Sequence, residues 1–336
     1  MEEDTTVSRL SNSEPGSQKP AVAGERTGEK AFLHVYGPVP SRRLGLSLGI
    51  SPIPKKTCNY SCVYCQLGRT DHLTNTRQLF FPVQTIIHEF ESFLNKQVFF
   101  DVVTIVGEGE PTLYSELGAL INAIKKLTDK PVAVITNGAL LYDQAVCDSL
   151  MSADIVLPSL DAYDQTTFRK INRPHGSLIY NSVFRGLEEF SHRYQGQLWM
   201  EIMLLAGIND SLDQLTRFKN LLLQIKYERL YINTAVRPPA EPNIQAVSSD
   251  KIRQAVDLLG GISIDLLHSQ GFHSEEPDHL TAIKGIIQRH PMNQHEILGF
   301  LHNRSCPDGE QVLEDLKKDN QVKVINYKGY DTYRLK

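Results

Sequence analysis

Short apolar runs alternate along the chain with stretches whose apolar residues have helical spacing. The apolar runs predict strands at Leu46–Ile53, Asp101–Val106, Pro131–Thr136, Asp154–Leu160, Gln197–Leu205 and Arg229–Val236. Helices are predicted near Ser115–Leu127, Tyr142–Met151, Tyr180–Arg193 and Leu212–Gln224. This alternation, with near-continuous apolar strands, is typical of a parallel sheet covered by helices. Six units predict an α/β fold with a partial (βα)6 barrel, whose chemistry is expected on the loops after the strands.

The two ends of the chain have a different pattern. Residues 1–30 are polar and rich in Ser, Gly, Glu and Thr, which predicts a disordered tail before a barrel at 31–240. A helical connector is expected at 241–280, with a helix near Ser248–Leu259. The remainder, 281–336, predicts helices at Ala282–Arg289, Gln294–Leu301 and Asp308–Lys318, and then a hairpin of Val322–Tyr327 and Tyr330–Leu335. Three short helices followed by a hairpin indicate a C-terminal winged-helix-like domain.

Composition narrows the class of protein. The chain is 41% hydrophobic and 22% charged, which is ordinary for a globular protein, and its net charge of −4 argues against a nucleic-acid coat or a polybasic membrane binder. No apolar run approaches the roughly 20 residues of a membrane span, and the first residues lack the apolar core of a signal peptide. We therefore expect a cytoplasmic protein with no membrane partner.

Three of the five cysteines lie close together, in the sequence CNYSCVYC after the first predicted strand. Cys58, Cys62 and Cys65 have the spacing C-x3-C-x2-C, which suits soft thiolate coordination of zinc or of an iron–sulfur cluster. Three ligands leave one iron of a four-iron cluster open, as a reactive cluster requires. The alternative is a structural zinc ion with His72 as its fourth ligand.

This spacing, with Tyr64 directly before the last cysteine, resembles the radical S-adenosylmethionine (radical SAM) superfamily. The resemblance covers about residues 36–240. It implies that Cys58, Cys62 and Cys65 hold one 4Fe–4S cluster, and that SAM binds the fourth iron. In that superfamily the reduced cluster cleaves SAM to methionine and a 5′-deoxyadenosyl radical, which abstracts a hydrogen from the substrate. An electron donor such as a flavodoxin or ferredoxin is then an expected partner.

Motifs at the other strand ends resemble the SAM-binding motifs of that superfamily. Gly107-Glu108-Gly109-Glu110-Pro111 is similar to its Gly-Gly-Glu motif, which meets the SAM amino group, but Glu108 replaces a glycine and leaves open which carboxylate touches the ligand. The resemblance implies cofactor-binding roles for Glu108, Gly109, Glu110, Thr136, Asn137, Ser159, Asp161, Glu201 and Asn209. Taken singly, these positions also fit strand-end turns and helix caps. Glu201 and Met203 share one face of a core strand, so the Glu201 charge must be paired or must line a cavity.

The stretch YGPVPSRRLGLSLGISPIPKKTCNYSCVYCQLGRT resembles a group of radical SAM proteins related to wyosine-type tRNA-modifying enzymes. Those enzymes carry a second cluster on further cysteines. Here only Cys147 and Cys306 remain, far apart in the sequence, so a second cluster is not expected. Two alternatives to a radical enzyme of unassigned substrate stay open. One is wyosine-type tRNA modification, and the other is a non-catalytic iron–sulfur or zinc protein that regulates through its winged helix.

The predicted C-terminal domain favours a large substrate, which we expect to be a tRNA, a protein or a peptide. Its third helix, DGEQVLEDLKK, is acidic, which argues against sequence-specific DNA binding. A basic surface near the cysteines is expected from Arg42, Arg43, Lys55, Lys56 and Arg69. The histidines His279, His290, His295 and His302 lack ligand-spaced partners and are expected at the surface.

Overall fold

A mostly parallel sheet forms the centre of the computed structural model, which describes residues 32–264, 271–274 and 276–336. Its eight strands have the order β1-β2-β5-β6-β7-β8-β9-β10. Their bounds are β1 Val35–Ser41, β2 Gly45–Ile50, β5 Val102–Ile105, β6 Val132–Thr136, β7 Ile155–Pro158, β8 Gln197–Leu204, β9 Arg229–Thr234 and β10 Ile262–Ser263. Only β1 is antiparallel to its neighbour. The prediction of an α/β fold with a mostly parallel sheet is confirmed.

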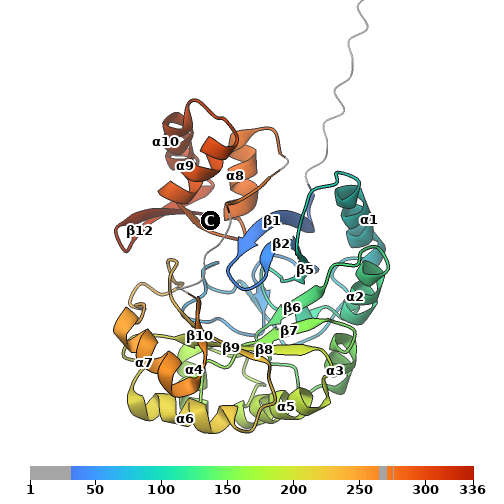
Figure 1. The fold of residues 1–336 in the computed structure, drawn as a ribbon, viewed down its shortest axis with the longest axis vertical. Coiled ribbons are helices and arrows are strands. Elements are labelled where there is room, and N and C mark those ends of the chain that lie inside the picture. Colours follow the sequence, from blue (N-terminus) through green and yellow to red (C-terminus); the bar gives the residue numbers. More distant parts are fainter. Residues whose placement is uncertain (1–31, 265–270, 275) are drawn as a thin grey trace, which may run out of the picture. The chain divides into compact units, whose positions relative to one another are not determined.

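Helices connect successive strands and lie outside the sheet (Figure 1). Their bounds are α1 Val83–Leu94, α2 Leu117–Lys125, α3 Gln144–Leu150, α4 Gln165–Ile171, α5 Tyr180–Arg193, α6 Leu212–Leu222 and α7 Ser249–Leu259, with a 3-10 turn η1 at Pro111–Leu113. Several begin at a side-chain cap, such as Ser211 and Gln214 in the capping box of α6. Within the described residues, no helix combines the length and the apolar character that crossing a membrane requires.

The alternation of side chains along β8 shows how the sheet separates core from site. Leu198, Met200, Ile202 and Leu204 belong to the large hydrophobic cluster between sheet and helices. Trp199 points to the other face, where it joins a smaller cluster with Tyr231 of β9. Glu201 and Met203 continue this inner face and line a cavity. Side chains therefore fill the inner face near the amino ends of the strands. Near the carboxyl ends of the strands, the inner face lines an open cavity.

The last part of the chain, residues 276–336, is called here the C-terminal module. It contains α8 His279–Ile287, β11 Met292–Asn293, α9 Gln294–Asn303, α10 Gly309–Lys318, β12 Val322–Tyr327 and β13 Tyr330–Leu335. The three strands form one antiparallel sheet in the order β11-β13-β12. A separate hydrophobic cluster, which includes Ile283, Phe300, Leu316 and Tyr333, holds the helices against this sheet.

Two strands of the large sheet were not predicted from the sequence. β10 lies inside the segment expected to be a helical connector and adds a seventh parallel strand beside β9. β1 adds an antiparallel strand beside β2, at the opposite end of the strand order. The polar tail expected at 1–30 lies outside the described residues.

Candidate active site

The three clustered cysteines lie on the loop that follows β2, and Cys58 belongs to the short strand β3 (Thr57–Cys58), which pairs with β4 (His72–Leu73). All three are free thiols and line one cavity of about 440 Å³. The cavity is also lined by residues from the ends of β5, β6, β7 and β8. The structure therefore brings together motifs that are up to about half the chain apart in sequence.

Amide groups point at two of the three sulfur atoms. The backbone N–H of Tyr60 donates to Cys58 Sγ over 3.4 Å, and Asn137 Nδ2 lies 3.7 Å from the same atom. Asn172 Nδ2 lies 3.6 Å from Cys62 Sγ. Burial raises the pKa of all three thiols, so without a metal they are protonated. Amide donors around sulfur compensate the charge of bound thiolates, as at iron–sulfur sites.

A preformed site for a single metal ion is not seen. Among residues 32–264, 271–274 and 276–336, no group of three or more His, Cys, Asp or Glu side chains is arranged to hold one ion. His72, the proposed fourth zinc ligand, is exposed on β4. A cluster spreads its thiolate ligands over separate irons, whereas zinc needs its ligands around one point at about 2.3 Å. The arrangement of the cysteines thus does not support the zinc alternative.

Both carboxylate oxygens of Glu110 accept hydrogen bonds from nearby residues of the protein. Its Oε1 accepts hydrogen bonds from the Thr112 backbone N–H at 3.0 Å and from the hydroxyls of Thr112 and Thr136 at 2.6 Å each. Its Oε2 accepts from the Asn137 backbone N–H at 2.7 Å. Burial raises the pKa of this carboxyl, and these four donors oppose the rise. Glu110 therefore fastens the loop after β5 to the end of β6.

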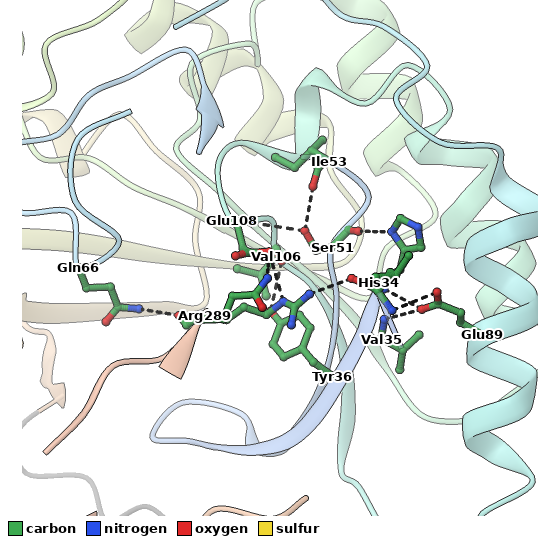
Figure 2. Close-up of polar contacts among 12 residues, drawn as sticks. His34, Val35, Tyr36, Ser51, Ile53, Gln66, Glu89, Val106, Glu108 and Arg289 are labelled. Atoms are coloured by element: carbon green, nitrogen blue, oxygen red, sulfur yellow. Dashed lines mark hydrogen bonds and ion pairs between the residues drawn. The ribbon is translucent and has the colours of Figure 1, made fainter. Parts of the chain in front are cut away.

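Glu108 points instead toward the C-terminal module (Figure 2). Its Oε2 accepts from Gln288 Nε2 at 3.2 Å and lies 3.5 Å from Arg289 Nε. The Arg289 guanidinium also lies over the Tyr36 ring, 4.4 Å from its centre, and donates to the Leu33 carbonyl at 2.8 Å. Within the described residues, Glu108 Oε1 is buried and has no hydrogen-bond partner. The glutamate that departs from the expected glycine is thus matched by an arginine 181 positions later in the chain.

Asp161 and Asn209 hold the framework and are not part of the cavity lining. Asp161 accepts from the Tyr64 hydroxyl, from Asn172 Nδ2 at 2.9 Å and from the Met203 backbone N–H at 3.0 Å. Asn209 is fully buried and donates to the carbonyls of Asp161 and Met203. These two residues therefore connect the cysteine loop with the ends of β7 and β8. Ser159, Thr136, Asn137, Gly109 and Glu201 do line the cavity.

Glu201 forms an ion pair and also lines the cavity. Both findings explain how a charged side chain is accommodated on a core strand. Glu201 forms the ion pair with Arg43, which follows β1, and accepts from Asn233 Nδ2 at 3.3 Å. Burial lowers the pKa of Arg43 to about 10, so this side chain stays charged at neutral pH. Because Arg43 is paired, it adds no unbalanced positive charge to the expected basic surface.

Two basic residues that flank the cysteine loop, Lys56 and Arg69, are also paired. Lys56 lies 3.5 Å from Asp71. Arg69 makes two hydrogen bonds to Glu241, at 2.8 and 3.0 Å, and Arg173 binds the same carboxylate. The Glu241 backbone N–H donates to the Val63 carbonyl at 3.1 Å. Glu241 therefore ties the cysteine loop to the segment after β9.

The contacts of Arg69 and Arg173 with Glu241 predict that the stability of the folded protein depends on pH. Arg69 and Arg173 lower the pKa of Glu241 from 4.5 to about 2, so the folded protein gains stability above the pKa of the unfolded chain and loses it as pH falls toward 2. We expect Glu241→Gln to lower the urea midpoint of unfolding at pH 7, and the difference from the unsubstituted protein to shrink between pH 4.5 and pH 2. Glu189→Gln, at an exposed position of α5, is the control. A difference of constant size across this range would contradict the assignment.

The C-terminal module and the segment before it supply part of the cavity wall, which sequence patterns did not reveal. Phe272, Arg289, His290 and Glu296 line the same cavity as the cysteines. His290, expected at the surface, lies edge-on to Phe272 at 5.1 Å, and burial lowers the pKa of its imidazole well below 6.5. Arg237, which follows β9, binds both carboxylate oxygens of Glu296, at 3.0 and 3.1 Å. No motif or spacing in the sequence marks these four cavity-lining residues.

Comparisons with known proteins agree with this arrangement. Residues 53–218 match the profile of the radical SAM superfamily. A UPF0026 protein of Methanocaldococcus jannaschii is 34% identical over 305 residues, which are 88% of this chain and 93% of that protein. A protein of Brachyspira hyodysenteriae named GTPase Obg is 37% identical over 249 residues, 74% of this chain, and the match spans only 37% of its own length.

A solved structure provides a comparison of the fold. The crystal structure of a radical SAM methyltransferase from Sphaerobacter thermophilus has a TM-score of 0.50 with 14% identity, and the match covers 66% of this chain and 68% of that one. At this identity the likeness concerns the fold alone. Together with the cysteine loop and the strand-end cavity, these matches show that the chain belongs to the UPF0026 family, within the radical SAM superfamily.

Proposed function

We propose that this protein is a radical enzyme that binds one 4Fe–4S cluster through Cys58, Cys62 and Cys65 and cleaves SAM reductively. The observation that carries the proposal is the single cavity shared by the three thiols and by the strand-end motifs. A protein that used its cysteines only for structure would not need polar strand-end groups around an open cavity beside them. This argues against the alternative of a non-catalytic regulator.

The residues present fit such a cluster. Three soft donors come from one loop, and amide groups point at two of the sulfurs. Among the residues that the structure describes, no fourth protein ligand is arranged with them. When bound, the cluster supplies the electron that cleaves SAM to methionine and a 5′-deoxyadenosyl radical. The chain itself holds the thiolates and orients SAM.

The two glutamates of the Gly107–Pro111 loop are assigned different roles. Glu110 already accepts four hydrogen bonds from Thr112, Thr136 and Asn137, so it positions the loop. Glu108 has an oxygen with no hydrogen-bond partner among the described residues, and it lines the cavity. A carboxylate oxygen of this kind suits an ammonium group. We assign Glu108 to the SAM amino group, and Asn137 and Ser159 to the remaining polar groups of the ligand.

The C-terminal module supports a substrate larger than a metabolite. Its order of three helices and a three-stranded antiparallel sheet supports the winged-helix interpretation. Arg289 and His290 place one end of this module at the cavity wall. We propose that the module presents a tRNA, a protein or a peptide to the cavity, and that a flavodoxin or ferredoxin supplies the electron.

The experiment that tests the proposed function is anaerobic reconstitution followed by reduction in the presence of SAM. About four irons per chain and formation of 5′-deoxyadenosine are expected. One equivalent of zinc with no visible charge-transfer absorption would overturn the cluster assignment. A fully loaded cluster that never cleaves SAM would instead favour the regulatory alternative.

A further inference from the structure

Gln66, which directly follows Cys65, is contacted twice by the C-terminal module. Arg334 of β13 donates to the Gln66 backbone carbonyl over 3.2 Å. The Gln66 side chain donates to the Arg289 carbonyl over 3.5 Å, as Figure 2 shows. Close by, Lys55 Nζ lies 3.4 Å from the Lys336 carbonyl. The last strand of the chain therefore lies against the cysteine loop.

Arg334 brings a positive charge to the Cys65 side of this loop. Its guanidinium lies 3.7 to 3.8 Å from where a Cβ at Gly68 would be, and the Gly68 backbone N–H donates to the Cys65 carbonyl at 3.1 Å. The guanidinium is half-buried, so water screens it less than it screens an exposed charge. Lys56, a second positively charged side chain, lines the same cavity as Cys65.

The surroundings of the other two cysteines have the opposite sign. Asn137 contacts both the Cys58 sulfur and the Glu110 carboxylate, and Asn172 contacts both the Cys62 sulfur and the Asp161 carboxylate, so a carboxylate lies close to each of these two cysteines. The cysteine loop is thus flanked by acidic groups of the barrel on one side and by Arg334 and Lys56 on the other. The contribution of the C-terminal module to this balance is positive.

We propose that Arg334 tunes the ease with which the iron–sulfur site accepts an electron, an inference that rests on the proposed function. A positive charge beside a cluster ligand stabilises the state with one more electron, and cover from solvent strengthens the interaction. The step concerned is the uptake of one electron from a reduced donor protein of the flavodoxin or ferredoxin class. The donor is oxidised by one electron, and no bond forms or breaks. The C-terminal module thereby influences reduction of the iron–sulfur site and also lines the cavity.

The test compares full-length, anaerobically reconstituted proteins in a redox titration followed by electron paramagnetic resonance, without SAM. Arg334→Gln is expected to bind the same amount of iron. At a fixed ambient potential its ratio of reduced to oxidised cluster should be about tenfold lower, a shift of about 59 mV to more negative potential for one electron. Arg334→Lys keeps the charge and should stay close to the unsubstituted protein. Lys318→Gln removes the same charge from an exposed position of α10 and should leave the potential unchanged.

Each outcome of this test decides one question. If Arg334→Gln loads iron fully and its potential equals that of the unsubstituted protein, the inference about Arg334 is wrong and the proposed function stands. If Lys318→Gln shifts the potential as much as Arg334→Gln, the effect is one of net charge and the inference is again wrong. If Arg334→Gln loses iron, Arg334→Lys decides, because only a role of the charge predicts full loading with an unchanged potential in that variant. If the unsubstituted protein binds no four-iron cluster, the proposed function itself fails.

Discussion

Cys62→Ala is expected to abolish SAM cleavage and to lower iron binding far below four irons per chain. Cys62 Sγ lies within reach of the Asn172 amide and lines the cavity, so its loss removes one of three ligands at the centre of the site. Substitutions that only perturb the surroundings of a metal ligand cost about 10- to 100-fold, so loss of the ligand itself should exceed about 100-fold in 5′-deoxyadenosine formation. The rate of its formation and the iron content, both measured on reconstituted protein, check this expectation.

The matched control is Cys306→Ala. This cysteine is a free thiol that packs against the hydrophobic cluster of the C-terminal module and does not line the cavity. Its replacement should leave iron content and SAM cleavage near those of the unsubstituted protein. If Cys306→Ala lost iron as fully as Cys62→Ala, the assignment of ligands to the C-x3-C-x2-C loop alone would be wrong.

Gly109→Ala should have the largest effect of any single methyl group added near the site. A Cβ at this position would overlap the carbonyl of Thr57, a backbone atom that cannot turn aside as a flexible side chain does. The Thr57 carbonyl also accepts the Glu110 backbone N–H at 3.0 Å, so relief of the overlap would separate the loop after β5 from the strand that holds Cys58. Overpacking of this kind costs about 1–3 kcal/mol or more.

Gly176→Ala is the control for that substitution, because a Cβ there would meet nothing within 4 Å. We expect Gly109→Ala to lower the urea midpoint of unfolding and to reduce iron incorporation, and Gly176→Ala to change neither. Unfolding curves and iron analysis of both variants test this. Equal behaviour of the two variants would show that the close approach of the two loops is not required.

The sequence predicted the elements that carry strong local patterns. α5 and the hairpin of β12 and β13 have the predicted bounds, because a wide apolar face and a Lys-Gly turn are local signals. α1 was missed although its apolar face is clear. β10 has two residues, too few to produce a pattern, and its place in the sheet depends on pairing with β9.

The candidate site divides in the same way. Cys58, Cys62 and Cys65 could be found because their spacing is itself a signal, and Glu201 because a charge on a core strand needs an explanation. Arg289 and His290 could not be predicted, because they reach the cavity through the packing of the C-terminal module. Their neighbour Gln288 contacts Glu108, which lies 180 positions earlier in the sequence. Such contacts arise from tertiary structure and leave no periodicity in the sequence.

The contact between Arg334 and Gln66 joins residues 268 positions apart, and this has a consequence for biosynthesis. A ribosome makes the cysteine loop long before it makes the strand that covers it. Proteins can begin to fold from the amino terminus during synthesis, so the parallel sheet and its helices can begin to form around an uncovered loop. Iron and sulfide donors therefore have their widest access to the cysteines before β13 is in place, and that access narrows once β13 packs against the loop.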